Sequence, residues 1–361
     1  MLLTRLAVRG FRNLADGVFD LPAPGVALLG ANGQGKTNLL EAVAYPVLLR
    51  SFRGAPDSEV VRHEAEGFRV EAIVAGSSGE GLLSLDLLWT TAGRRKQVLI
   101  DQVPEPRPLD AIGRWLAVVF QPGDVALAGG TAEERRRFLD QMLALTDAGY
   151  LRALVRYRAA LRRRNAALRQ QHFEVARACE PVLADAGALI VRSRLEWIAN
   201  EGADFSAELA ALGEPGAATL AYAGRPELAS VAAWPDALAE VVARDRQRGA
   251  TSIGPHRDDV RITLEGRPMR TFGSTGQIRS AAIALRLLER ETLRRRRGQE
   301  AALVLDDIFA ELDGERQERL MSRLRDGITQ VFISAPRADE LPRGLELPTW
   351  NLTSGRIGRA A

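Results

Sequence analysis

The chain has 361 residues, of which 46% are hydrophobic and 26% charged, and its formal net charge is +3. This length allows two or three domains with buried cores, and this composition is typical of a folded soluble protein. No apolar run approaches the roughly 20 residues that span a bilayer, so no contact with a membrane is expected. Residues 1–10 alternate like a strand and lack the apolar core of a signal peptide. Cys179 is the single cysteine, which excludes an internal disulfide and favours a cytoplasmic protein.

Short strands are predicted at residues 1–9, 17–21 and 26–29, and a helix at 36–49. Alternating apolar and polar residues then predict an antiparallel sheet from strands at 68–75, 82–89 and 94–103. A further strand is predicted at 115–120. We expect residues 1–128 to form the N-terminal lobe of an α/β domain.

Helices replace this pattern from Thr131, which with Glu134 has the spacing of a capping box. Apolar residues recur at helical spacing at Leu151, Leu154, Leu161 and Leu168. Pro181 favours the start of a second helix, which is expected to run towards Asn200 and to end near Gly202. We interpret residues 129–205 as a short arm of helices that fold back on themselves. The alternative is an ordinary helical subdomain. Strands and helices alternate again in a C-terminal lobe at 206–361.

A glycine-rich segment at 30–37 matches the phosphate-binding pattern G-x-x-x-x-G-K-[ST] and lies between an apolar strand and a helix. Its residues are Gly30, Ala31, Asn32, Gly33, Gln34, Gly35, Lys36 and Thr37, and Asn38 extends the set expected to contact a nucleotide. Glycine lets backbone N–H groups approach a phosphate, and the helix N-terminus adds partial positive charge. The sequence has two lysines, Lys36 and Lys96. Lys36 is expected to reach the β- and γ-phosphates as a catalytic residue, and Thr37 is expected to bind Mg²⁺. The alternative is a glycine-rich turn.

An apolar strand at 303–305 ends in two carboxylates, Asp306 and Asp307. We expect Asp306 to hold Mg²⁺, directly or through water, and Asp307 to orient or activate the attacking water. By itself this segment is equally a strand that ends in a polar turn, and its pairing with the glycine-rich segment favours the nucleotide site. The two motifs lie much farther apart than a minimal P-loop domain needs, which indicates two lobes separated by an inserted arm.

Ser274, Gly276 and Gln277 precede a helix at 278–293 and resemble the signature motif of ABC-type ATPases. In that superfamily the signature contacts the ATP bound by a partner head, so the resemblance implies an ATP-dependent homodimer. Residues 310–313, which end in Asp313, look like its D-loop. Ser334 follows the strand at 331–333, at the position where the superfamily carries its switch residue. Gln121, after the strand at 117–120, is a plausible Q-loop glutamine and metal contact.

With these motifs in place the chain resembles the RecF family over nearly its full length. The segments that carry the likeness are 6–14, 50–53, 136–140 and 254–259. The resemblance implies an SMC-type head with a short arm that binds ATP, dimerises on it, binds DNA and hydrolyses ATP slowly. It also implies action with RecO and RecR to place RecA on gapped DNA. The sequence departs from the family pattern at Ile278, where glutamine is usual, and at Ala310, where serine is common. These departures bear on turnover more than on nucleotide binding.

The prediction is therefore an α/β ABC/SMC-type P-loop ATPase head with an inserted short helical arm. We expect a weak DNA-dependent ATPase of recombinational repair and replication, with ATP and Mg²⁺ as cofactors. The expected partners are single-stranded and gapped duplex DNA, a second copy of the chain, RecR, RecO and RecA. One alternative is a nucleotide-locked scaffold for partner proteins with incidental hydrolysis. A membrane-transporter ATPase, which needs shorter motif spacing and no arm, and a nuclease fused to such a head are disfavoured.

Arginine supplies nearly all of the positive charge, which permits nucleic-acid binding without establishing it. Candidate DNA contacts are the arginine runs at 135–137, 162–164 and 294–297. Each is also explained as a solvated face or as charge that stabilises a helix end. His256 and Arg257 have two interpretations, one as contacts to a phosphate or nucleotide and one as buried structural residues.

Overall fold

The structure is a computed structural model that describes residues 1–76, 81–325, 327 and 330–359. The chain divides into two compact units, one of residues 1–123 with 289–361 and one of residues 124–288. The predicted boundaries after residues 128 and 205 do not coincide with this division. Residues 206–288 group with the arm helices because strand β9 (Ala218–Ala223) packs against the long arm helix α7 (Glu180–Ala211).

The first unit contains an antiparallel sheet of strand order β2-β1-β4-β5-β6-β7. Its strands are β1 (Leu2–Arg9), β2 (Gly17–Asp20), β4 (Gly67–Ala75), β5 (Leu82–Thr90), β6 (Arg95–Ile100) and β7 (Val103–Pro104). Every second residue of β4 is buried, as expected for a sheet with one face on the core. The single strand predicted at 94–103 is wrong, because Asp101 and Gln102 both have positive φ and form a tight hairpin between β6 and β7.

The second sheet of this unit has the order β15-β14-β3-β13-β12-β8. Its strands are β3 (Gly25–Leu29), β8 (Ala117–Phe120), β12 (Ala302–Leu305), β13 (Val331–Ala335), β14 (Thr349–Thr353) and β15 (Arg356–Arg359). All pairs except β14–β15 are parallel, and β3, β12 and β13 are buried at every residue. Helix α1 (Lys36–Leu48) contacts β4 of the first sheet and β8 and β13 of the second, so it lies in the core between the sheets. The other helices of the unit are α2 (Asp57–Val60) and α11 (Gly314–Arg325), with 3₁₀ turns at Pro108–Ala111, Phe309–Glu311 and Ala338–Glu340 and one that begins at Pro122.

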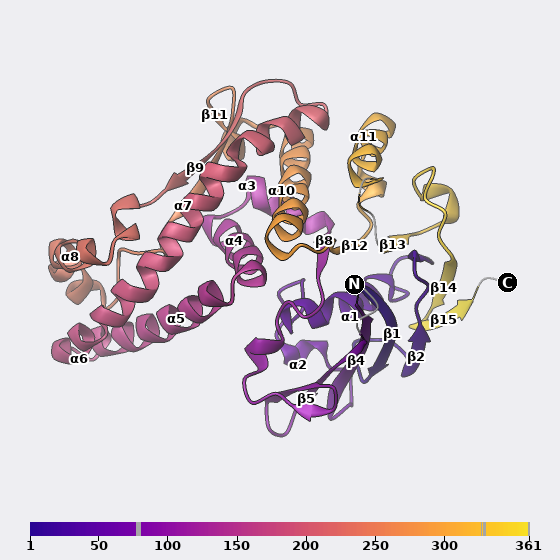
Figure 1. The fold of residues 1–361 in the computed structure, drawn as a ribbon, viewed down its shortest axis with the longest axis horizontal. Helices are drawn as coiled ribbons and strands as arrows, with labels where there is room; N and C mark the ends of the chain where they lie inside the picture. The colour runs from indigo at the N-terminus through magenta and orange to yellow at the C-terminus, as the bar shows by residue number, and fades with distance from the viewer. Residues whose placement is uncertain (77–80, 326, 328–329, 360–361) are drawn as a thin grey trace. The chain divides into compact units, whose positions relative to one another are not determined.

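The second unit is mainly helical. It contains α3 (Val125–Gly129), α4 (Ala132–Thr146), α5 (Ala148–Arg169), α6 (Phe173–Ala178), α7, α8 (Trp234–Arg248), α9 (Met269–Phe272) and the start of α10 (Thr275–Arg297). Its small antiparallel sheet has the order β11-β10-β9, with β10 at Asp259–Leu264 and β11 at Arg267–Pro268, and its 3₁₀ turns are Pro226–Ala229 and Val231–Ala233. Helices α5 and α7 pack side by side with α6 between them in the chain, which confirms the predicted fold-back (Figure 1). We call α5, α6 and α7 the helical arm.

The ends of the arm helices differ in how well local sequence predicts them. The capping box at Thr131 and Glu134 is present in both of its hydrogen bonds. The end predicted for α7 near Gly202 is wrong, since the helix continues to Ala211. Phe205 and Leu209 are buried and extend the apolar face past the glycine, and this packing outweighs the roughly 1 kcal/mol that glycine costs inside a helix. In the part of the chain that the structure describes, no helix has the length and apolar character needed to cross a membrane.

Candidate nucleotide site

The parallel strands of the second sheet bring the predicted motifs to one edge. Strands β3, β13, β12 and β8 are neighbours and end at the same edge because they run in the same direction. The glycine-rich loop follows β3, Asp306 follows β12 and Gln121 follows β8. The Asp306 N–H donates to the carbonyl of Phe120 at 2.9 Å, which sets Gln121 beside Asp306. This edge is where ligands bind in open parallel sheets.

The glycine-rich loop needs its glycines. Gly30, Gly33 and Gly35 have φ of 151°, 80° and 106°, which favour glycine. A Cβ on Gly30 would lie 2.5 Å from the carbonyl oxygen of Leu352. Gly35 begins α1 without a side-chain cap among the described residues, so the first N–H groups of the helix remain available to an anion.

Lys36 is buried and faces the loop rather than solvent. Its Nζ donates to the carbonyls of Gly30 at 2.6 Å and Ala31 at 3.3 Å. The ammonium group is therefore held within the ring of backbone that a phosphate group would enter. A compact cation on a flexible stem suits this position better than the broad, planar guanidinium that the chain uses almost everywhere else.

A hydrogen-bonded set of four side chains lies beside the loop. Thr37 Oγ1 donates to Asp306 Oδ1 at 2.9 Å. Ser334 Oγ lies 2.9 Å from Asp306 Oδ1 and 3.0 Å from Asp307 Oδ1, and it accepts the Asp307 N–H at 2.9 Å. The Ser334 hydroxyl has one proton, so it donates to one carboxylate at a time and holds the pair in place. Asp307 has a φ of 48°, a left-handed backbone conformation that is uncommon for a residue other than glycine.

Burial sets the electrostatics of Asp306. Its carboxylate is nearly inaccessible, and desolvation raises its pKa above the ordinary value, with the hydrogen bonds from Ser334 and Thr37 acting in the opposite direction. A buried carboxylate beside a hydroxyl is a pair of hard oxygen ligands. Among the described residues no group of three or more His, Cys, Asp or Glu side chains could hold a metal. The carboxylate and hydroxyl of Asp306 and Thr37 are of the type that Mg²⁺ takes as ligands, together with phosphate oxygens and water.

Residues that the sequence analysis missed brace the loop from outside. The turn between β14 and β15 reaches over it, where the N–H of Ser354 donates to Gln34 Oε1 at 2.6 Å and that of Gly355 to the Gln34 carbonyl at 2.9 Å. Asn13 Nδ2 lies 3.4 Å from the Gly33 carbonyl, and Asn13 Oδ1 accepts from Asn38 Nδ2 at 2.8 Å. These contacts join positions far apart in the chain, so no local pattern could have revealed them.

Two of the family-like segments meet on helix α1. Arg12 forms a two-pronged ion pair with the buried Glu41 at 2.8 and 2.9 Å. Arg53 lies 3.7 Å from the same carboxylate and donates to Asn38 Oδ1 at 3.2 Å. Segments 6–14 and 50–53 thus hold the helix that carries Lys36 and Thr37.

The predicted signature residues lie in the other compact unit, at the start of α10. The Gln277 N–H donates to Ser274 Oγ at 3.2 Å, and the Ser274 N–H donates to Gln277 Oε1 at 2.9 Å. This reciprocal pair caps the helix, Gly276 lies in its first turn, and Ser274 is exposed. Asp313 caps α11 in a similar way by accepting the Arg316 N–H at 2.9 Å, and this bond, the largest influence, lowers its pKa.

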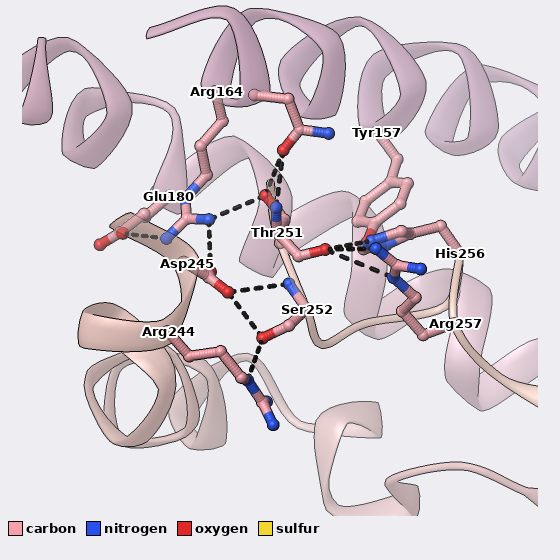
Figure 2. Close-up of polar contacts among 10 residues, drawn as sticks. Tyr157, Arg164, Glu180, Arg244, Asp245, Thr251, Ser252, His256 and Arg257 are labelled. Atoms are coloured by element: carbon pink, nitrogen blue, oxygen red, sulfur yellow. Dashed lines mark hydrogen bonds and ion pairs between the residues drawn. The ribbon is translucent and has the colours of Figure 1, made fainter. Parts of the chain in front are cut away.

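The remaining family-like segments contact each other in the second unit. Arg136 of segment 136–140 donates to the Asp258 carbonyl of segment 254–259 at 2.5 Å, and Arg135, directly before the first segment, pairs with Asp259 at 2.7 and 2.9 Å. His256 Nε2 lies 3.0 Å from the Thr251 carbonyl and Nδ1 lies 2.7 Å from the Tyr157 hydroxyl (Figure 2). Since a carbonyl only accepts, Nε2 carries the proton. Burial lowers the pKa of His256 to about 4, which favours the buried structural interpretation.

The three arginine runs separate into buried and exposed residues. Arg135 and Arg164 are buried in ion pairs with Asp259 and Asp245, so they are structural. Arg294 and Arg295 are exposed and pair with Glu291. Arg162 and Arg163 are exposed on α5.

Comparison with known proteins agrees with this geometry. No family model matches the chain. A DNA replication and repair protein RecF from Anaeromyxobacter sp. (strain Fw109-5) is 38% identical over 345 residues, 92% of each chain. The protein of the same name from Frankia alni is 33% identical over all of both chains.

Solved structures add the fold. The recombination mediator protein RecF in its ATP form, described as part of the RecFOR pathway, superimposes with a TM-score of 0.91 at 25% identity over 100% of this chain and 98% of that one. A Smc head domain from Pyrococcus furiosus has a TM-score of 0.57 at 16% identity over 98% and 94% of the two chains. The predicted ABC/SMC-type head is confirmed, and the chain belongs to the RecF family of DNA replication and repair proteins.

Proposed function

We propose that this chain is an ATP-gated DNA-binding protein in which nucleotide binding closes two copies and hydrolysis releases them. The observation that carries the proposal is the hydrogen-bonded set of Thr37, Asp306, Ser334 and Asp307 beside the glycine-rich loop. The recombination mediator protein RecF, a member of the same family, has been solved in an ATP form, which supports the choice of nucleotide.

Each residue of the site has a chemical role in this proposal. The backbone N–H groups of residues 30–37 and the Lys36 ammonium bind the β- and γ-phosphates. Thr37 and Asp306 hold Mg²⁺, and Gln121, which directly follows the adjacent strand β8, is a further candidate ligand. When bound, Mg²⁺ neutralises charge on the phosphate oxygens. Asp307 orients the attacking water and accepts its proton, while the Ser334 hydroxyl fixes the direction of that carboxylate.

The second copy completes the site from the signature helix. Ser274, Gly276 and Gln277 lie at the N-terminus of a long helix, where Ser274 is exposed, and this end attracts the phosphates of the nucleotide bound by the partner. Asp313 ends the D-loop segment directly before α11 and belongs to the same interface. We infer slow hydrolysis that responds to DNA, with single-stranded and gapped duplex DNA as ligands. RecR, RecO and RecA are the protein partners that family membership supports.

Sedimentation of the purified chain tests the proposal. With ATP and Mg²⁺ the chain should become a dimer, and a gapped duplex should bind that dimer more tightly than the monomer. Lys36→Ala should abolish dimerisation and Asp307→Asn should prolong it, while Arg95→Ala, at an exposed position of β6, serves as the charge-matched control. A chain that stays monomeric with ATP and Mg²⁺, even as Asp307→Asn, contradicts the proposal. If repair in cells survives Asp307→Asn, the scaffold alternative replaces it.

A further inference from the structure

We propose that exposed arginines at the end of the helical arm bind the phosphate backbone of duplex DNA; this inference rests on the proposed function and locates its DNA contact. Helix α5 has 22 residues, seven of them arginine and none aspartate or glutamate. Three of the seven are bonded within the protein, since Arg156, Arg158 and Arg164 pair with Asp185, Asp140 and Asp245.

The remaining arginines near the end of α5 face solvent together with those of a neighbouring helix. We define the arm-end arginines as Arg162, Arg163 and Arg169 of α5 and Arg244, Arg246 and Arg248 of α8. All six are exposed, and none forms an ion pair with any residue in the described ranges. The two helix ends are in contact, because a Cβ on Gly249, directly after α8, would lie 2.9 Å from Arg169 Cγ.

A buried polar network fixes the backbone beneath this surface (Figure 2). Arg164 donates to Asp245 of α8 and to Thr251 Oγ1, each at 2.8 Å. Asp245 in turn accepts from the Ser252 hydroxyl at 2.6 Å and from its N–H at 3.0 Å. The network joins α5, α8 and the segment after α8 through side chains that are almost wholly buried. The elements that carry the arm-end arginines are therefore held in place before any ligand arrives, which lowers the ordering cost of binding.

Two of the arm-end arginines also have side-chain contacts with neighbouring residues of the second unit. Arg244 Nε donates to Ser252 Oγ at 3.1 Å, and the Arg246 guanidinium lies 4.4 Å from the centre of the Phe173 ring of α6. Both contacts leave guanidinium N–H groups free to bond to a ligand, since each guanidinium has five. Helices α5 and α8 thus present their cations on one rigid support, with the Phe173 ring of α6 packed against Arg246.

The positions of the arm-end arginines indicate that the ligand is a polyanion. Arginine near a helix C-terminus is stabilised by the helix dipole, which accounts for Arg169, Arg246 and Arg248 in last turns. It does not account for Arg162 and Arg163, which lie about 10 Å farther back along α5 at 1.5 Å per residue. Cations on the two helices α5 and α8 that form no ion pair in the described part of the chain match the dense, regular charge of a DNA backbone, and a guanidinium group can donate two hydrogen bonds to one phosphate. The relatives are DNA replication and repair proteins, which favours DNA over an acidic protein surface.

The test removes three arm-end arginines together, as Arg162→Gln, Arg163→Gln and Arg169→Gln. The matched control is Arg94→Gln, Arg95→Gln and Arg107→Gln, which removes the same charge from exposed positions of the other compact unit. Fluorescence anisotropy with a short labelled duplex of arbitrary sequence measures affinity across a salt series. We expect the arm variant to lose affinity for the duplex at least about ten-fold at low salt. The slope of log affinity against log salt concentration should become shallower by about 3, because each of the three lost phosphate contacts releases about one counterion. The control should bind like the unmodified chain.

An unchanged affinity and slope in the arm variant overturns the inference. If that variant instead loses binding to vesicles of anionic lipid while its DNA binding is intact, the surface recognises a membrane and the DNA assignment is also overturned. A thermal melt verifies that the triple variant is folded. If it is not, the single variant Arg163→Gln is measured instead, and it should make the salt dependence of duplex affinity shallower by about 1. ATP-dependent dimerisation of the unmodified chain is measured in parallel. If that chain does not dimerise with ATP, the result contradicts the proposed function and leaves the DNA contact at the arm-end arginines to be decided by the affinity measurements.

Discussion

Thr37 and Asp306 are 269 residues apart in the chain, and their side chains meet in a 2.9 Å hydrogen bond. The bond joins the helix after the glycine-rich loop to the strand that ends in two carboxylates. It places a hydroxyl and a buried carboxylate where a hard cation between protein and phosphate is expected. The first prediction concerns this pair.

Thr37→Val keeps the shape of the side chain and removes its hydroxyl. Because the hydroxyl is a proposed ligand of Mg²⁺, ATP affinity measured by calorimetry should fall about ten-fold with Mg²⁺, the equivalent of about 1.4 kcal/mol. Affinity without Mg²⁺ should change little. Equal losses in both conditions would show that the residue acts through the loop and not through the metal.

Arg164→Met tests the buried network under the arm. It leaves Asp245, which is 0% exposed, without its guanidinium, and breaking such a pair costs about 3–5 kcal/mol of unfolding free energy. Arg156→Met on the same helix removes an exposed pair with Asp185 and should cost less than about 1 kcal/mol. Urea unfolding measures both, and similar midpoints for the two variants would contradict the assignment.

His256 makes the stability of the fold sensitive to acid. Burial lowers its pKa from 6.5 to about 4, so between these values the unfolded chain binds a proton that the folded chain excludes. Its contribution is therefore fully present above pH 6.5 and is lost as the pH falls towards 4, by up to about 3 kcal/mol. His256→Gln should flatten this dependence when unfolding is measured across that range.

Asp258 changes the unfolding free energy with pH in the opposite direction to His256, and it does so in the unmodified chain and in the His256→Gln variant alike. Burial raises its pKa from 3.8 to about 6, so its effect destabilises the fold as the pH rises through that window. Subtracting the unfolding free energy of the His256→Gln variant from that of the unmodified chain at each pH cancels the contribution of Asp258, which both proteins share. A difference that does not vary with pH would count against a neutral, buried histidine.

Two glycines of α7 should respond oppositely to alanine. A Cβ on Gly202 meets no described atom within 4 Å, so Gly202→Ala should stabilise the protein by roughly 0.5–1 kcal/mol through helix propensity. A Cβ on Gly187 would lie 2.3 Å from the ring of Trp234, so Gly187→Ala should destabilise it. Thermal melts of the two variants check the sign of each change.

Much of this molecule could be predicted from short stretches of sequence. The buried strand before Gly30 could be predicted from its apolar run, although its pairing partners are distant in the chain. The capping box at Thr131 and the helix that begins at Lys36 depend on bonds between residues a few positions apart. Such bonds form wherever the same local pattern occurs, so the pattern is sufficient to predict them. The family-like segments were also visible as sequence.

Tertiary structure alone decided which side chains are buried and what they contact. Nothing local to Arg164 distinguishes it from the exposed Arg163, yet it is bonded to Asp245, 81 residues away. In the same way Ser354 bonds to Gln34, 320 residues away, and the buried face at Phe205 carries α7 past a glycine. Burial and long-range partners depend on how distant elements pack, and that packing is a property of the whole fold and not of any short segment.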